Sequence, residues 1–266
     1  MNTPPFPAVV TAAGAATRFH PFSAVVPKEM LPLGHTPAVE HVIVECLNAG
    51  ATEVIVVTRP GDQIIPAYVR SLREDGLPVE AEEEDLSHGY GNATPLLTVR
   101  DRLLVCETFA VAFGDDILLG EQPCGWNLAT MYDRMHRDVE AVIAAQRIHP
   151  SETRSFGIID TTPEHAEQVA AIRQRPDPQT VEEPLAVVSR LMLRPSILDR
   201  LVPTELARGE VDLGIAVGQL ATEANVGVHR IAGHWVTVGD PRHYLDALQT
   251  YWHLDTTEPA TTGEGS

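Results

Sequence analysis

The chain is poor in cysteine, and it has no long apolar run. Its three cysteines, Cys46, Cys106 and Cys124, are widely separated and fit no metal-binding spacing, which favours a reducing, cytoplasmic environment. No run approaches the roughly 18 apolar residues that cross a membrane. Residues 1–7 carry no basic region and no long apolar stretch, so we expect no secretory signal. These absences argue against a disulfide framework, a cysteine-based metal site and a membrane protein.

Basic residues are also scarce, since 19 of them stand against 37 acidic residues and the net charge is −18. Nucleic acids and anionic membranes bind basic surfaces, so we expect neither as a partner. A phosphate ligand would then need a few local cations, backbone N–H groups and a divalent metal ion. The acidic run at residues 80–85 is expected to be a solvated loop.

Strand-like apolar runs alternate with helical stretches, as in α/β proteins. This alternation predicts an α/β fold with a doubly wound sheet, mixed but mostly parallel, whose ligands bind at the carboxyl ends of the strands. The expected strands are 6–10, 54–58, 108–113, 139–145, 157–160, 169–172 and 185–193. The expected helices are 39–48, 64–74, 92–101, 126–137, 195–202 and 213–224.

The first expected strand leads into small residues at 12–16, which cannot fill a core. Such residues let the backbone approach a ligand closely and present N–H groups to it. Arg18 and Lys28 follow, with no other charge before Glu29. A small-residue loop with two cations behind it suits a phosphate ligand. Ordinary surface cations after a common kind of loop are the alternative.

Residues 11–37, TAAGAATRFHPFSAVVPKEMLPLGHTP, resemble the opening motif of the sugar-1-phosphate nucleotidyltransferases, most closely the bacterial UTP–glucose-1-phosphate uridylyltransferase branch. That motif reads A-A-G-x-G-T-R-F-x-P, then P-K-E-M-L-P. The resemblance implies a Rossmann-like nucleotidyltransferase fold in a single domain, 1–254. Its nucleotide-binding half would be 8–150 and its sugar-binding half 151–254. The remainder, 255–266, is rich in Thr, Glu, Gly and Pro and is expected to be a disordered tail.

The resemblance assigns phosphate and metal roles to the first half of the chain. Gly114-Asp115-Asp116 closes an expected strand, where a phosphate-bound Mg²⁺ would lie, although Gly-Asp is also common in simple turns. Asp115 matches the metal-binding Asp of the family. The catalytic candidates are Arg18, Lys28 and Asp115, and the candidates for nucleotide contact in the loop are Ala12, Ala13 and Gly14.

Residues 88–93, HGYGNA, resemble the G-x-G-x-A loop of the family, which holds the nucleotide base, with Gly89 as the candidate. In the family a Gln a few residues earlier reads the base edge, and that position falls near Glu84. A carboxylate only accepts hydrogen bonds. It suits the adjacent N1–H and N2–H groups of guanine better than uracil. We therefore expect GTP to compete at least as well as UTP.

Residues 155–160, SFGIID, are similar to the Y-G-V-V-D strand of the family, whose glycine lies against the sugar. Gly157 takes that place. The family continues with V-E-K-P, and this chain has Arg173-Gln174-Arg175-Pro176. Gln174 would bind the sugar hydroxyls, and Arg175 would hold the sugar phosphate.

Two further segments follow the family with changes. Residues 185–190, LAVVSR, follow its L-A-V-V-G-R strand, and residues 235–245 resemble W-x-D-x-G-x-P-x-x-Y-L. The Asp of the second pattern is the second metal-side carboxylate, and Thr237 occupies its place. A hydroxyl is a much poorer ligand for a hard cation. We expect water to fill in for the missing carboxylate.

Two functions stay open. The first is an enzyme that uses Mg²⁺ and joins an NTP to a sugar-1-phosphate with release of pyrophosphate. The second is a non-catalytic or regulatory paralogue that binds a nucleotide or sugar nucleotide. Loss of the carboxylate at residue 237 is typical of the second, whereas retention of Arg18, Lys28 and Asp115 favours the first. The base, the sugar and the oligomeric state stay open, with a homo-oligomer among the alternatives.

Overall fold

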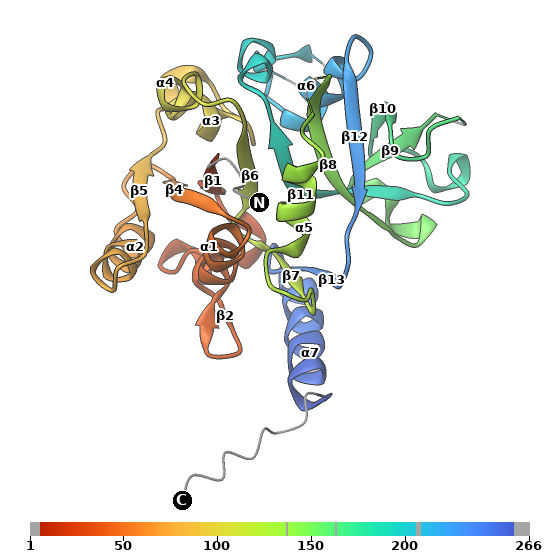
Figure 1. The fold of residues 1–266 in the computed structure, drawn as a ribbon. Helices are drawn as coiled ribbons and strands as arrows, with labels where there is room; N and C mark the ends of the chain where they lie inside the picture. The colour runs from red at the N-terminus through yellow and green to blue at the C-terminus, as the bar shows by residue number, and fades with distance from the viewer. Residues whose placement is uncertain (1–5, 137, 163, 206–208, 258–266) are drawn as a thin grey trace, which may run out of the picture.

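The computed structural model describes residues 6–136, 138–162, 164–205 and 209–257. Figure 1 shows a twisted sheet running through the molecule, with one long helix extending below it. The strands of the main sheet are β1 (Phe6–Ala12), β4 (Ala51–Thr58), β5 (Val79–Glu83), β6 (Phe109–Phe113), β8 (Val139–Arg147), β9 (Gly157–Thr161), β10 (Val169–Gln174), β11 (Leu185–Leu193) and β12 (Asn225–Arg230). Two small sheets pair β2 (Pro32–Leu33) with β3 (Thr36–Pro37), and β7 (Asp116–Leu119) with β13 (His234–Thr237).

The main sheet has the strand order β10-β9-β11-β6-β1-β4-β5, and β8 joins β11 to β12. Strands β6, β1, β4 and β5 run parallel to one another. Strand β11 pairs antiparallel with β6, β8 and β9, so the sheet is mixed. The predicted α/β fold is confirmed, and its all-parallel part contains the strand that leads into the small-residue loop.

Helices cover both faces of this sheet. They are α1 (Ala38–Asn48), α2 (Ile64–Glu74), α3 (Thr94–Thr98), α4 (Arg100–Leu103), α5 (Trp126–Asp133), α6 (Leu213–Leu220) and α7 (Pro241–Thr257). The helix expected at 64–74 is α2 with the same bounds. The helix expected at 92–101 is instead two short helices, because Val99 leaves helical geometry with a φ of −105°.

Three further boundaries differ from the prediction. The helix expected at 126–137 is α5, which ends at Asp133, and residue 137 lies outside the described residues. The stretch expected at 195–202 is a 3₁₀ helix, Pro195–Arg200. The helix expected at 213–224 is α6, which ends four residues earlier at Leu220.

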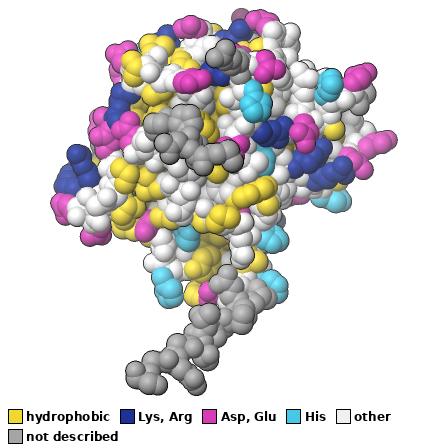
Figure 2. All heavy atoms as spheres, in the orientation of Figure 1, with side chains coloured by type: hydrophobic (Ala, Val, Ile, Leu, Met, Phe, Trp, Pro, Cys, Tyr) yellow, Lys and Arg dark blue, Asp and Glu magenta, His cyan; other side chains and the backbone are white. Residues whose placement is uncertain are grey.

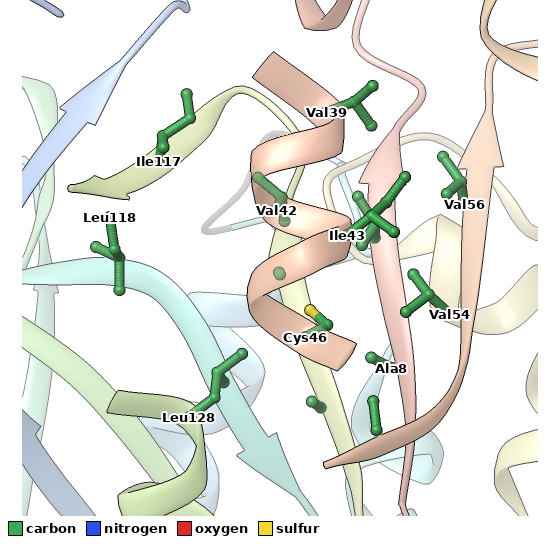
Figure 3. Packing of buried hydrophobic residues seen from close by; sticks show 14 of the residues in the cluster. Ala8, Val39, Val42, Ile43, Cys46, Val54, Val56, Ile117, Leu118 and Leu128 are labelled. Carbon is green, nitrogen blue, oxygen red and sulfur yellow. The ribbon is translucent and has the colours of Figure 1, made fainter. Parts of the chain in front are cut away.

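Strand β1 shows why the central parallel strands contain apolar runs. Ala8 and Val10 belong to the core on one face of the sheet, whereas Val9 belongs to the core on the other. Figure 3 shows the first of these cores, where Ile43 and Cys46 of α1 lie next to β1 and β4. Because helices cover both faces, every position of the strand except Thr11 is buried and apolar.

The acidic run at 80–85 is not only a solvated loop. Its first four residues belong to β5, which pairs in parallel with β4 at the edge of the sheet. Arg102 of α4 bonds to Glu80 and also pairs with Glu53 at 2.6 Å. An edge strand has one solvent side, and charged side chains there protect it from pairing with another chain.

Helix α7 is fixed against the β2–β3 hairpin. Gly34 of that hairpin has a φ of +67°, and a Cβ there would lie 2.3 Å from the ring of Tyr251. The Tyr244 hydroxyl donates to the Pro32 carbonyl at 2.8 Å. Residues 255–257, expected to begin a disordered tail, instead form the end of α7, which continues to Thr257. Residues 258–266 lie outside the described part of the chain.

The surface agrees with the charge balance of the sequence. On the face shown in Figure 2, Lys and Arg side chains are interspersed with Asp and Glu. Among the described residues, no helix combines the length and the apolar character needed to cross a membrane.

A buried ion pair joins α1 to β11, and its loss is expected to be costly. Arg190 is fully buried and donates to Glu45 from Nε at 2.9 Å and from Nη2 at 2.7 Å. Glu45→Gln leaves that guanidinium without a counter-charge, so the free energy of unfolding should fall by about 3–5 kcal/mol. Denaturation in guanidinium chloride measures this change in the free energy of unfolding.

The exposed pair Arg100–Asp199, at 2.7 Å, supplies the control. Asp199→Asn should change the free energy of unfolding by less than about 1 kcal/mol, because exposed ion pairs contribute little. Equal, small losses in both variants would contradict a stabilising role for the buried pair.

Candidate active site

Two adjoining cavities open where β1 and β6 end. The larger has a volume of about 470 Å³ and the smaller about 290 Å³. Asn92, Phe113 and Asp115 line both cavities, so the two meet beside the end of β6. The carboxyl ends of parallel strands are where α/β sheets bind their ligands, and the sequence predicts this location.

The residues predicted from the sequence divide between the two cavities. The smaller is lined by Ala13, Gly14, Lys28, Glu84 and Asp115, and the larger by Arg18, Asp115, Gly157, Gln174 and Arg175. Arg18 therefore lies with the sugar-side candidates, although it directly follows the loop. Two candidates line neither cavity: Ala12 is buried in β1, and a Cβ on Gly89 would meet Val211.

Lys28, the only lysine of the chain, lines the smaller cavity beside Asp115, which lines both cavities. Its ammonium donates to the Asp115 carboxylate and lies 3.7 Å from Glu29 Oε1. Burial acts to lower the pKa of Lys28, but the charges of Asp115 and Glu29 outweigh it and raise the pKa above its ordinary value. A Cβ on Gly14 would lie 3.4 Å from Lys28 Nζ. The loop and the only lysine thus enclose the same space.

Glu29 is a buried carboxyl in the smaller cavity that the sequence did not single out. Its residue is 2% exposed. Burial raises the pKa of Glu29 to about 7, although the neighbouring Lys28 acts to lower it. A carboxyl of this kind can hold or release a proton near neutral pH, beside the loop.

The loop at 88–93 is anchored to the second half of the chain. Val211 N–H donates to the Tyr90 carbonyl at 2.8 Å, and a Cβ on Gly91 would lie 2.2 Å from the Val211 oxygen. Asn92 Nδ2 donates to Asp212 Oδ2 at 2.9 Å, and its Oδ1 accepts from Leu213 N–H at 2.7 Å. Asn92 is therefore a cross-link between the two halves of the chain.

Glu84 lines the smaller cavity, at the position predicted to read the base. The buried Thr94 hydroxyl donates a hydrogen bond to Glu84 Oε1, and Glu84 Oε2 takes no part in that hydrogen bond. Glu84 is half-buried, and its main-chain N–H donates to the Thr58 carbonyl at 2.8 Å. The end of β4 thus fixes the carboxylate that faces the cavity.

Asp115 and Asp116 both line the larger cavity. The Ser189 hydroxyl donates to Asp116 Oδ2, and Thr237 lies directly opposite Asp116 in the β7–β13 pair. Burial and the charge of Asp115 raise the pKa of Asp116, while hydrogen bonds from Ser189 and Thr237 oppose that shift. Over the described ranges, no three His, Cys, Asp or Glu side chains are grouped to hold a metal ion. Any cation here would need substrate oxygens as well as these carboxylates.

Gln174 and Arg175 lie at the sugar end of the larger cavity. The Gln174 amide approaches helix α6, because a Cβ on Gly214 would lie 2.9 Å from its Nε2. Arg175 has a φ of +48°, and its N–H donates to the Phe156 carbonyl at 3.1 Å. Arg154, which also lines this cavity, differs from Arg175 in pairing with Asp177 at 2.9 Å. Arg175 is the better candidate for an anionic ligand.

A model of the nucleotidyl transferase family matches residues 7–253. The chain belongs to this family. It is 28% identical over 254 residues to UTP–glucose-1-phosphate uridylyltransferase 1 of Staphylococcus saprophyticus, and the match covers 88% of each protein. It is 29% identical over 262 residues to UTP–glucose-1-phosphate uridylyltransferase of Bacillus subtilis, covering 90% of this chain and 88% of that protein.

Solved structures share the nucleotidyltransferase fold. A UDP-glucose pyrophosphorylase complexed with UDP-glucose has a TM-score of 0.78 at 20% identity, covering 94% of this chain and 99% of that one. A UTP-bound UGPase from Acinetobacter baumannii has a TM-score of 0.77 at 24% identity, covering 96% and 95%.

Several residues of this nucleotidyltransferase site were missed from the sequence. Glu29 and Asn92 have neighbours that only the fold supplies, and Ser189 looks like an ordinary strand residue. A signal existed for Ser189, because it stands where the family pattern has glycine. Asp116 was overlooked because Asp115 alone matched the family's metal ligand.

Ala16 holds a left-handed backbone in the nucleotidyltransferase loop, with a φ of 50° and a ψ of 35°. This conformation costs a non-glycine residue about 1 kcal/mol. We expect Ala16→Gly to raise the free energy of unfolding by up to about 1 kcal/mol, measured by chemical denaturation.

Ala15→Gly is the matched control, since Ala15 is not among the positive-φ residues of the described chain. Glycine there only adds freedom to the unfolded chain, so stability should fall by about 0.5–1 kcal/mol. A loss of stability in Ala16→Gly that equals the loss in the control would be evidence against strain.

Proposed function

We propose that the chain is a UTP–sugar-1-phosphate uridylyltransferase, with glucose-1-phosphate as its sugar phosphate. The observation that carries the proposal is the Lys28–Asp115 pair where the two cavities meet. It provides a cation and a metal-binding carboxylate at the place where a nucleotide in one cavity would approach a sugar phosphate in the other. The names of the uridylyltransferase relatives, which cover most of the chain, support this base and this sugar.

The reaction is an in-line displacement at phosphorus. A phosphate oxygen of the sugar-1-phosphate forms a bond to the α-phosphorus of UTP, and the bond from that phosphorus to the bridging oxygen breaks. Pyrophosphate leaves with the electron pair of that bond. No covalent enzyme intermediate is needed, so catalysis consists of positioning and of neutralising negative charge.

The cations of the site have separate roles in this proposal. Lys28 exchanges Asp115 for the α-phosphate when UTP enters, because its ammonium lies beside the Gly14 loop. Arg18 and Arg175 line the larger cavity, where Arg175 holds the sugar phosphate and Arg18 the phosphates that meet it. The guanidinium fork suits phosphate oxygens. Gln174 binds the sugar hydroxyls beside Gly157.

The donors present fit Mg²⁺, because carboxylate and hydroxyl oxygens at Asp115 and Thr237 are hard ligands. Asp115 is the residue that would hold the ion together with phosphate oxygens, and the ion when bound would neutralise phosphate charge. The Thr237 hydroxyl donates to the Asp115 carbonyl at 3.2 Å. That contact holds the main chain of the ligand residue in place.

We place this reaction in the cytoplasm. The three cysteines are free in the structure, which agrees with a reducing compartment. The partners are UTP and the sugar-1-phosphate, and the net charge of −18 disfavours nucleic acid. A homo-oligomer remains an open expectation. The non-catalytic alternative is disfavoured, because Lys28, Asp115 and Arg18 all line the cavities.

The direct test is release of pyrophosphate from UTP with glucose-1-phosphate and Mg²⁺. We expect the wild type to release it and Lys28→Ala to lower kcat/KM for UTP by at least about 10-fold. The reason is that a charge-assisted phosphate contact contributes about 1.5–3 kcal/mol. A panel of other sugar-1-phosphates identifies the sugar.

Arg70→Ala is the control, because Arg70 is exposed on α2 and lines neither cavity. Its kcat/KM should equal that of the wild type. If the wild type releases no pyrophosphate with any combination of NTP and sugar phosphate, the proposed function is refuted.

The Thr94 hydroxyl affects which bases the Glu84 carboxylate can bind. The expected preference for GTP depended on two free acceptors at Glu84, but Oε1 already accepts from Thr94. The remaining Oε2 can accept from N3–H of uracil as well as from N1–H of guanine. UTP is the proposed nucleotide because the named relatives are uridylyltransferases, and the expectation that GTP competes at least as well stays a prediction.

Glu84→Gln should strengthen the preference for UTP. The amide oxygen can still accept from Thr94, while the amide N–H can donate to uracil O4. We expect the UTP/GTP ratio of kcat/KM to rise about 10-fold, which corresponds to about 1.4 kcal/mol. Glu83→Gln, in the exposed neighbour, should leave the ratio unchanged. An unchanged ratio in Glu84→Gln would mean that residue 84 does not read the base.

A further inference from the structure

Within the described ranges, no Lys or Arg side chain forms an ion pair with the Asp116 carboxylate. Arg190 lies beside it, but that guanidinium donates to Glu45, to the Ser189 carbonyl at 3.1 Å and to the main-chain oxygen of Asp116 at 2.8 Å. Lys28, the nearest ammonium, donates to Asp115. Two adjacent carboxylates therefore share one lysine, in a cavity proposed to receive phosphate.

That charge arrangement is unfavourable for a phosphate ligand. Like charges a few ångströms apart repel strongly where water is excluded. Asp115 and Asp116 both line the larger cavity, so a phosphate arriving there meets both carboxylates. A divalent cation between the carboxylates and the phosphate would remove this repulsion, and Mg²⁺ is commonly bound by one or two carboxylates plus substrate phosphates.

One hydroxyl group holds the Asp116 carboxylate, and a second lies on the facing strand. Ser189 Oγ donates to Asp116 Oδ2, and Thr237 lies opposite Asp116 across the β7–β13 pair. These are two positions at which the chain departs from its family pattern, with Ser in place of Gly and Thr in place of Asp. Ser189 supplies a donor to the Asp116 carboxylate, and the Thr237 hydroxyl donates to the main-chain carbonyl of Asp115 at 3.2 Å. Hydrogen bonds such as that from Ser189 orient a metal-binding carboxylate.

We propose that Asp116 supplies the second protein carboxylate to the divalent cation, in place of a carboxylate at residue 237, and that Ser189 orients it. The inference rests on the proposed function and replaces the expectation that only water compensates for Thr237. Asp116 is then a ligand residue and Ser189 a positioning residue, whereas Thr237 holds the main chain of Asp115. The second carboxylate would then come from Asp116 on β7 and not from the facing position, residue 237, on β13.

The test measures Mn²⁺ binding directly, by water-proton relaxation, with the non-reacting analogue α,β-methylene-UTP present. Asp116→Asn should weaken Mn²⁺ binding by at least about 10-fold, and Ser189→Ala should weaken it less. Asp212→Asn is the control, because it removes a carboxylate from the same cavity and asparagine can still cap α6. It should leave the Mn²⁺ affinity unchanged.

A rescue separates metal ligation from a structural role. Asp116→Asn combined with Thr237→Asp returns a carboxylate to the facing position, so Mn²⁺ affinity should recover to within about 3-fold of wild type. A double variant that binds Mn²⁺ as weakly as Asp116→Asn overturns the inference. Thermal melting shows whether Asp116→Asn is folded, and if it is not, unchanged Mn²⁺ affinity in Ser189→Ala overturns the inference.

Turnover is measured separately, so that the two proposals can fail independently. A wild type that binds Mn²⁺ through Asp116 but forms no UDP-sugar refutes the proposed function and supports this inference. A wild type that forms UDP-sugar while folded Asp116→Asn binds Mn²⁺ normally refutes this inference alone.

Discussion

The buried ion pair between Glu45 and Arg190 connects the core of the fold to the site. Glu45 lies on α1, in the helix that packs on β1, and Arg190 lies in β11. The same guanidinium donates to the main-chain oxygen of Asp116, where β7 begins. A buried charge is tolerated only when its partners are in place. Helix α1, β11 and the turn after β6 must therefore assemble together, and that turn carries Asp115.

A strongly acidic protein that binds two polyanions has to concentrate its few cations. Many arginines form ion pairs with acidic side chains at the surface, such as Arg100–Asp199 and Arg200–Glu223. The only lysine lines the smaller cavity, and three arginines, Arg18, Arg154 and Arg175, line the larger one. Backbone N–H groups of the small-residue loop and a divalent cation would supply the remaining positive charge. The charge balance of the chain thus explains why so few side chains carry the proposed chemistry.

The elements that sequence reasoning located well are those whose pattern is local. Helix α2 has an apolar face at regular spacing, and the central parallel strands β1, β4 and β6 contain apolar runs. The acidic strand β5 was missed because its pattern is that of a solvated loop, and only its pairing with β4 makes it a strand. Strands β7 and β13 were missed for the same reason, since each pairs only with a segment about 120 residues away, as Thr237↔Asp116 illustrates.

The sequence by itself determined the α/β class, the family resemblance and the cations that follow the first strand, because these depend on residue types at short spacing. Tertiary structure decided which groups meet. It placed Arg18 with the sugar-side residues and made Asn92 a cross-link to Asp212. It also brought the Thr94 hydroxyl to Glu84, where it donates to Oε1. It also brought Ser189 and Thr237 to Asp116. Contacts between residues far apart in the chain arise from strand order and register, which no local pattern encodes.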